Sequence, residues 1–178
     1  MNFLIDSDSS SDDNEEPSNE NEKFLWAAGN GKIDMVKQMF ESNSDLIKWK
    51  DEDGYTAIHR ASSEGQFEVI EYLLKHGADA NVKTLDGWTP LHCACKWNNA
   101  KAATVLLANG AEINNVTNGN NTPLHAAASE KGNEDVLKLL LAHDKVDISV
   151  VNDGGDTAYD LVRRNTANAG LFQTAASK

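Results

Sequence analysis

Three histidines recur at equal spacing along the chain, a pattern that raises the question of a metal site. His59, His92 and His125 stand 33 residues apart. A structural zinc ion needs nitrogen ligands about 2 Å away. Equivalent positions in stacked helical units lie about 10 Å apart, as packed helices do. We therefore expect the histidines to make structural hydrogen bonds, both locally and to the neighbouring unit.

The other patterns that could carry chemistry are incomplete. Cys93 and Cys95 are two residues apart, so on a helix they point in different directions and do not share a metal. The glycine-rich run at 29–32 lacks the spacing and the hydroxyl of a phosphate-binding loop. No nucleophile elbow or metalloprotease motif occurs. We expect no enzyme activity, no cofactor and, without an apparent secretion signal, reduced thiols.

A repeated string organises the elements around these residues. Thr-Pro-Leu-His occurs at 89–92 and 122–125, with a looser copy, Thr-Ala-Ile-His, at 56–59 and Thr-Ala-Tyr-Asp at 157–160. A fixed period of about 33 residues is typical of a solenoid of stacked units. In each unit the threonine opens a helix, a glycine or asparagine ends it, and a second helix follows. Asn98 and Asn120 stand where the other units have glycine. Asparagine is tolerated there because it enters the left-handed region more readily than most residues.

These units resemble ankyrin repeats. The likeness rests on Asp-Gly-Trp-Thr-Pro-Leu-His at 86–92, a Leu-Leu pair at 106–107 and Gly-Ala-Glu-Ile-Asn at 110–114. It implies an all-α ankyrin-repeat solenoid of helix-turn-helix units with hairpin-like loops, over residues 23–178. The expected units are a cap repeat at 23–50, full repeats at 51–83, 84–116 and 117–151, and a second cap repeat at 152–178. The third full repeat is longer, and we place the extra residues in the turn at 129–133.

Residues 1–22 differ from the rest of the chain. They contain eight of the acidic residues, no Lys or Arg, and few hydrophobic residues. Such a segment cannot bury enough apolar surface to offset its ordering entropy, so we expect a disordered acidic tail. Near its start, the apolar run Phe3, Leu4 and Ile5 resembles a SUMO-interacting motif, which adds a short strand to a sheet edge.

Ser9 and Ser10 are candidate phosphorylation sites in this tail. Each has an aspartate three residues further on, the pattern that acid-directed kinases favour. Phosphorylation would deepen the negative charge. A tail that serves only solubility is the alternative interpretation.

The overall charge excludes one class of partner. The formal net charge is −12, and removing the eight acids of the tail leaves −4. No basic patch of the kind that binds nucleic acid is present, so we expect no direct contact with DNA or RNA. No apolar run reaches 18 residues, so we expect no transmembrane helix.

The resemblance also predicts where a partner docks. Ankyrin proteins usually bind on the concave surface made by the hairpin tips and the first helices. Mapping by register from each threonine gives seven candidate residues: Tyr55, Arg60, Glu64, Trp88, Lys96, Trp97 and Asn121. Trp88 and Trp97 are the leading hot-spot candidates, because surface tryptophans bury a large area with little rotamer loss. The alternative is that one of them packs over a neighbouring hairpin.

Three further residues have expected places. Cys93 occupies the helix position equivalent to Arg60 on the concave surface. Trp49 lies near a repeat boundary and is expected in the core, and Trp26 is expected to be structural in the amino-terminal cap. The last helix has only Leu171 and Phe172 as large anchors, so we expect it to fray.

The resemblance implies a noncatalytic, intracellular protein-binding module. A closer likeness at 86–99, to one four-repeat group of the family with an acidic amino-terminal segment, implies a nuclear protein linked to transcriptional regulation. We expect a monomeric nuclear adaptor or transcriptional cofactor that binds a protein partner. The first alternative is a cytoplasmic adaptor, assembly factor or inhibitor that sequesters a signalling protein. The second is an enzyme regulator whose acidic tail mimics nucleic acid or an acidic substrate.

Overall fold

The computed structural model describes residues 16–165 and 170–175. The predictions for Phe3, Leu4, Ile5, Ser9 and Ser10 lie outside the described residues. The described chain forms helices and loops without a β-strand, apart from one isolated bridge between Val151 and Thr157. Its elements are α1 (Glu20–Gly29), α2 (Ile33–Ser42), the short 3₁₀ turn η1 (Ser44–Lys48), α3 (Ala57–Ser63), α4 (Phe67–Lys75), α5 (Pro90–Lys96), α6 (Ala100–Ala108), α7 (Pro123–Ala128), α8 (Glu134–Ala142), α9 (Ala158–Asn165) and α10 (Gly170–Ala175).

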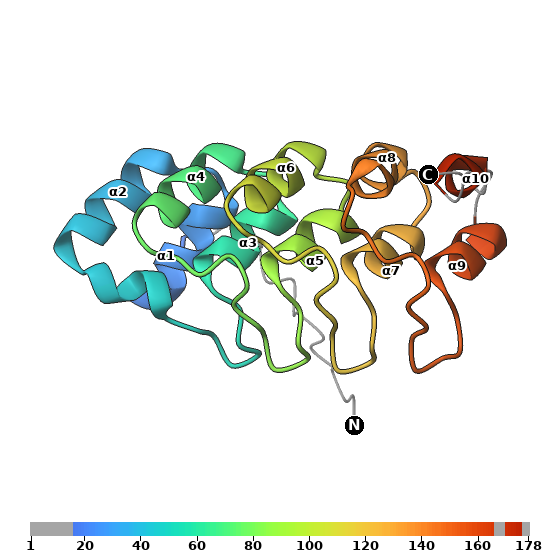
Figure 1. Cartoon of the computed structure of the whole chain (residues 1–178). Helices are drawn as coiled ribbons and strands as arrows, with labels where there is room; N and C mark the ends of the chain where they lie inside the picture. Colours follow the sequence, from blue (N-terminus) through green and yellow to red (C-terminus); the bar gives the residue numbers. More distant parts are fainter. Residues whose placement is uncertain (1–15, 166–169, 176–178) are drawn as a thin grey trace, which may run out of the picture.

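The helices lie in two parallel rows. Figure 1 shows α1, α3, α5, α7 and α9 side by side in one row, and the even-numbered helices in a second row above them. Each helix of the first row, which we call the inner row, packs against the next inner helix. The long loops between units extend from the side of the inner row away from the even-numbered helices, which form the outer row. The predicted all-α solenoid is confirmed.

The inner helices begin and pack as the repeated string predicts. Thr89 and Thr122 are helix N-caps, and proline follows each of them in the first turn. Leu91 and Leu124 are buried between units. Small buried residues such as Ala61 and Ala94 face the rest of the core and let neighbouring helices approach closely.

The turns between units are also stacked closely. The backbone N–H of Leu85 donates to the carbonyl of Asp53 at 2.9 Å, which joins one hairpin to the next. Gly54 has a positive φ of 86°, and a Cβ there would lie 2.9 Å from the backbone nitrogen of Leu85. Only glycine therefore fits this turn without displacing the next hairpin. Asn98 and Asn120, at φ 55° and 56°, adopt the predicted left-handed conformation.

The start of the first helix differs from the prediction, whereas the position of the longer turn agrees with it. Helix α1 begins at Glu20, inside the segment expected to be the tail, because the Asn19 side chain accepts a hydrogen bond from the Asn21 N–H at 2.9 Å and caps the helix. The turn between α7 and α8 spans residues 129–133, where the corresponding turn between α5 and α6 spans 97–99. The extra length of the third full repeat lies where it was predicted.

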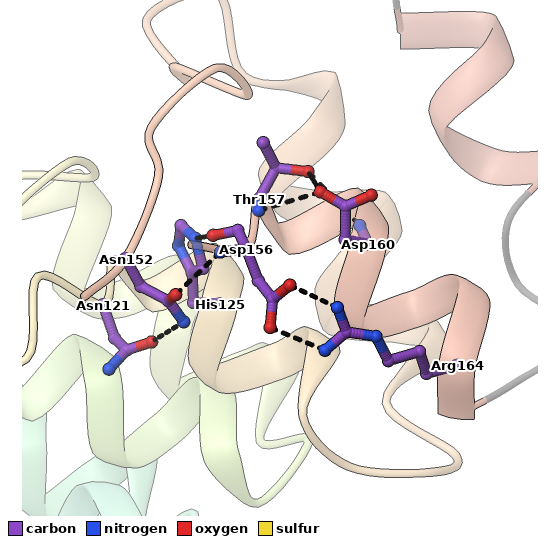
Figure 2. Close-up of polar contacts among 7 residues, drawn as sticks. All are labelled: Asn121, His125, Asn152, Asp156, Thr157, Asp160 and Arg164. Atoms are coloured by element: carbon purple, nitrogen blue, oxygen red, sulfur yellow. Dashed lines mark hydrogen bonds and ion pairs between the residues drawn. The ribbon is translucent and has the colours of Figure 1, made fainter. Parts of the chain in front are cut away.

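The last described unit closes the stack differently from the others (Figure 2). Asp160 stands where the earlier units have histidine, and its carboxylate accepts hydrogen bonds from the Thr157 N–H at 3.0 Å and hydroxyl at 2.6 Å. It thus replaces the local role of the histidine at the start of α9.

Candidate protein-binding face

The repeated histidines connect each inner helix to the following hairpin. The Nδ1 atoms of His59, His92 and His125 accept hydrogen bonds from the threonine N–H three residues earlier, at 3.1, 3.2 and 3.2 Å. Nδ1 is therefore unprotonated, and Nε2 carries the hydrogen. That Nε2–H donates to a carbonyl of the next unit, at Trp88, Asn121 or Asp156. The predicted structural role is confirmed, and Figure 2 shows it for His125 and Asp156.

The imidazoles are held in their neutral form. Burial lowers the pKa of His59 and His92 to about 4, and it also lowers the pKa of His125. Within residues 16–165 and 170–175 no group of three or more His, Cys, Asp and Glu side chains is placed to hold a metal ion. None of the described helices is long and apolar enough to cross a membrane.

The hairpin loops and the exposed sides of the inner-row helices form one surface, which we call the inner face. Trp97, at the carboxyl end of α5, is 62% exposed. Among the described large hydrophobic side chains, only it, Leu85 and Val151 are classed as exposed. Trp88 differs, because its indole is half-buried against the core and its ring lies 5.7 Å from the His92 ring. The structure thus separates two tryptophans that the register treats alike.

Four of the other candidate residues make contacts within the chain. Lys96 forms an ion pair with Glu130 of the next unit. The Asn121 side-chain oxygen accepts from Asn152 Nδ2 at 2.9 Å, as Figure 2 shows. Arg60 donates to the Asp51 carboxylate at 2.7 Å and lies 4.7 Å over the half-buried Tyr55 ring. These four residues, predicted to bind a partner, thus also make contacts that hold the inner face together.

The position equivalent to Arg60 in the next unit does not reach the surface. Cys93 is 3% exposed, and burial raises the pKa of its thiol to about 12. The expectation that Cys93 continues the exposed face is therefore wrong. A small apolar thiol is buried at this point of the inner row, whereas the long Arg60 side chain extends to solvent.

A groove opens on the inner face between the first two units. It has a volume of about 670 Å³ and lies between α1 and α3. Arg60 and Glu64 line it, and so do two tryptophans that the sequence assigned to structural roles, Trp26 and Trp49. Trp49 is half-buried and packs against the edge of the core, so its expected place within the core is wrong.

The register contains the signal that would have placed Trp26 here. The left-handed glycine that ends the first helix of a unit, Gly31 or Gly65, follows Trp26 and Arg60 by the same five residues. Trp26 therefore occupies the position of Arg60 one unit earlier. Its indole Nε1 is buried and has no hydrogen-bond partner among the described residues.

The chain matches one family, both by a family model and by individual relatives. The family model described as ankyrin repeats, in three copies, matches residues 1–84, 24–117 and 77–152. Over 150 residues the chain is 50% identical to ankyrin repeat domain-containing protein 49 of Bos taurus and 49% identical to that of Homo sapiens. Each match covers 84% of this chain and 63% of the relative, so the chain spans less than two thirds of their length.

A third relative carries the name of an enzyme. The chain is 38% identical over 58 residues to palmitoyltransferase akr1 of Schizosaccharomyces pombe. That match covers 33% of this chain but only 9% of the relative. It is a local likeness and extends to a small part of the larger protein.

Proposed function

This chain belongs to the ankyrin-repeat family, and from that premise we propose that it is a noncatalytic module that binds a protein partner on its inner face. The resemblance stated from the sequence is confirmed by the family match and by the relatives of the protein 49 group. The inner face offers tryptophan and tyrosine side chains and an arginine, the residue types most enriched in interface hot spots.

The observation that carries this proposal is the exposure of Trp97. An indole that is 62% exposed leaves much of its apolar surface in water, and burying that surface in an interface is favourable. The neighbouring Lys96–Glu130 ion pair and the core packing of Trp88 hold the surroundings in place. We therefore take Trp97 as the main anchor for a partner, on surroundings that are already packed.

The test compares two alanine variants of the same repeat in affinity capture from cells. Trp97→Ala removes the anchor, whereas Thr104→Ala changes an exposed residue of the outer helix α6. Both variants are first checked for native helicity by circular dichroism. We expect Trp97→Ala to weaken a specific partner by about 2 kcal/mol, roughly thirtyfold, and Thr104→Ala to leave recovery unchanged. Unchanged recovery with both Trp97→Ala and Trp88→Ala would exclude the Trp88–Trp97 part of this face.

The place of action proposed here is the nucleus, where the module would serve as an adaptor or transcriptional cofactor. The support is the likeness of the chain to the protein 49 group, over 84% of its length. Immunofluorescence of a chain with a short epitope tag tests this, since a small tag does not itself restrict passage into the nucleus. Exclusion of the chain and its captured partner from the nucleus would favour the cytoplasmic adaptor, assembly factor or inhibitor instead.

The acidic amino-terminal segment needs a deletion that respects the structure. Removing residues 1–22 would also delete Asn19 and the first turn of α1, and so would damage the fold. A deletion of residues 1–15 keeps that cap. Loss of the partner with this deletion, but not with Trp97→Ala, would assign binding to the acidic segment and not to the repeats.

A further inference from the structure

We propose that the groove between α1 and α3 receives a basic segment of a partner protein, with a lysine or arginine side chain held beside Trp26 and Trp49. The inference rests on the proposed protein-binding function and adds the chemistry of the partner to it. It concerns a part of the inner face distinct from Trp97, which does not line the groove.

The groove has an excess of negative charge. Three carboxylates line it, from Glu22, Asp51 and Glu64, against one guanidinium, from Arg60. Arg60 is already neutralised by Asp51 at 2.7 Å and covered by the Tyr55 ring at 4.7 Å. The remaining two carboxylates, of Glu22 and Glu64, define the charge that a ligand meets.

These two carboxylates are available for binding. Glu22 and Glu64 are both exposed, and in the described part of the chain neither side chain makes an ion pair or a hydrogen bond. They come from different elements, with Glu22 in the first turn of α1 and Glu64 directly after α3, and both line the groove. A cation anywhere along the groove is therefore attracted by negative charge from two elements.

The tryptophans make the groove selective for a cation on a long apolar stem. Trp26 and Trp49 are half-buried, so each presents part of an indole to the groove. The negative face of an indole attracts a guanidinium or ammonium group. The methylene stem of lysine or arginine packs on the remaining apolar surface. A volume of about 670 Å³ has room for such a side chain with its flanking backbone.

The negative charge of the groove also disfavours three other classes of occupant. Residues 1–15 of this chain carry five acids and no Lys or Arg, so the groove repels them. A second copy of the chain has a net charge of −12, and nucleic acid is a polyanion. Each would bring negative charge to a negative surface, which costs free energy and slows association. A basic protein segment is the occupant whose charge is complementary.

The test uses two blocked peptides, an alternating Gly-Lys peptide and the uncharged Gly-Gln peptide of equal length. They are titrated into the ¹⁵N-labelled chain, and the indole N–H resonances of Trp26 and Trp49 are followed by NMR. We expect the Gly-Lys peptide to shift both resonances saturably, with an affinity that falls as salt is raised. The Gly-Gln peptide should shift neither. Equal shifts with both peptides would overturn the proposal.

A pair of double variants localises the effect. Glu22→Gln/Glu64→Gln removes the two free charges of the groove and should weaken the Gly-Lys peptide about tenfold or more. Glu68→Gln/Glu71→Gln removes two exposed charges from the outer helix α4 and should leave binding within about twofold. Equal weakening by the two variants would show attraction to the net charge alone, and would overturn the groove assignment.

The outcome is separable from that of the proposed function. If Trp97→Ala abolishes recovery of a partner while Glu22→Gln/Glu64→Gln changes neither that recovery nor peptide binding, the groove inference fails and the inner-face proposal stands. If the Gly-Lys peptide binds in the groove but no inner-face variant alters partner recovery, the groove binds basic segments and the inner-face proposal fails.

Discussion

The Nε2 atom of His92 donates a hydrogen bond to the backbone carbonyl of Asn121, 2.9 Å away in the next repeat. The same bond joins His59 to Trp88 and His125 to Asp156, both at 3.1 Å. Each of these histidines therefore fixes both the start of its own helix and the position of the following hairpin. The hairpins that shape the inner face are held by neutral imidazoles.

Stability should consequently fall in mild acid. The pKa of His59 and His92 is about 4 in the fold, against about 6.5 in an unfolded chain. Between these values the unfolded chain binds more protons, so the free energy of unfolding decreases as the pH falls from 6.5 to 4. Each of the two should cost about 2 kcal/mol between pH 7.5 and 5. Urea unfolding over this pH range measures the effect.

A His92→Gln variant separates the histidine contribution from general acid denaturation. Glutamine does not titrate, so the variant should be less stable at neutral pH but should lose clearly less stability on acidification. An acid dependence as steep as that of the unchanged chain would contradict the account.

Asn98 should stabilise the fold through both its backbone conformation and its side-chain hydrogen bonds. It has a φ of 55°, its amide donates to the Gly132 carbonyl at 3.1 Å, and its side-chain oxygen accepts from the Val136 N–H at 3.2 Å. Asn98→Ala loses these bonds and strains the left-handed backbone, so we expect a loss of about 2–3 kcal/mol. Asn98→Gly loses the bonds alone and should be about 1 kcal/mol more stable than the alanine variant. Chemical unfolding measures the stability of both variants. A glycine variant less stable than the alanine variant would contradict the left-handed strain assigned to position 98.

Both cysteines should be inert in the native chain. Cys93 has a pKa of about 12, burial raises the pKa of Cys95 as well, and both side chains are buried. Because the thiolate is the reactive form, a disulfide reagent at pH 8 should label neither residue until urea unfolds the protein. Prompt labelling of either thiol in buffer would show that the inner row opens at this point.

Helix α10 should exchange its amide hydrogens faster than the rest of the stack. It packs on α8, and its main anchor is Phe172, which is 4% exposed and has its ring 5.6 Å from that of Tyr159. A helix of this length with few anchors opens locally at low cost. Hydrogen exchange monitored by mass spectrometry should show weak protection at 170–175 and strong protection in α8. Equal protection of both helices would refute the expected fraying.

The sequence predicts best the features that repeat. The helix starts at Thr89 and Thr122, the left-handed Asn98 and the bonds of the histidines follow from local chemistry that recurs in each unit. Exposure is harder to predict, because it depends on what the neighbouring unit brings. The register places Trp88 and Trp97 on the same face of one repeat. In the structure, however, Trp88 packs on the core while Trp97 remains exposed to solvent.

The groove could be anticipated only in part. The register predicts Arg60 and Glu64 on the inner face, and both line the groove. The register places Trp49 in the core because it lies near a repeat boundary, and it gives Trp26 a structural role in the amino-terminal cap. Among the described residues, α3 is the inner helix against which α1 packs, and Trp26 lines the groove between these two helices. A pattern derived from internal repeats does not predict such a groove.

The most direct test of binding on the inner face is a hydrogen-exchange comparison of the chain with and without its captured partner. The account predicts slower exchange at the end of α5 and in the hairpin loops, around residues 85–88 and 96–99, with the outer helices α4, α6 and α8 unchanged. Protection confined to the outer row, with residues 96–99 exchanging as in the free chain, would contradict it.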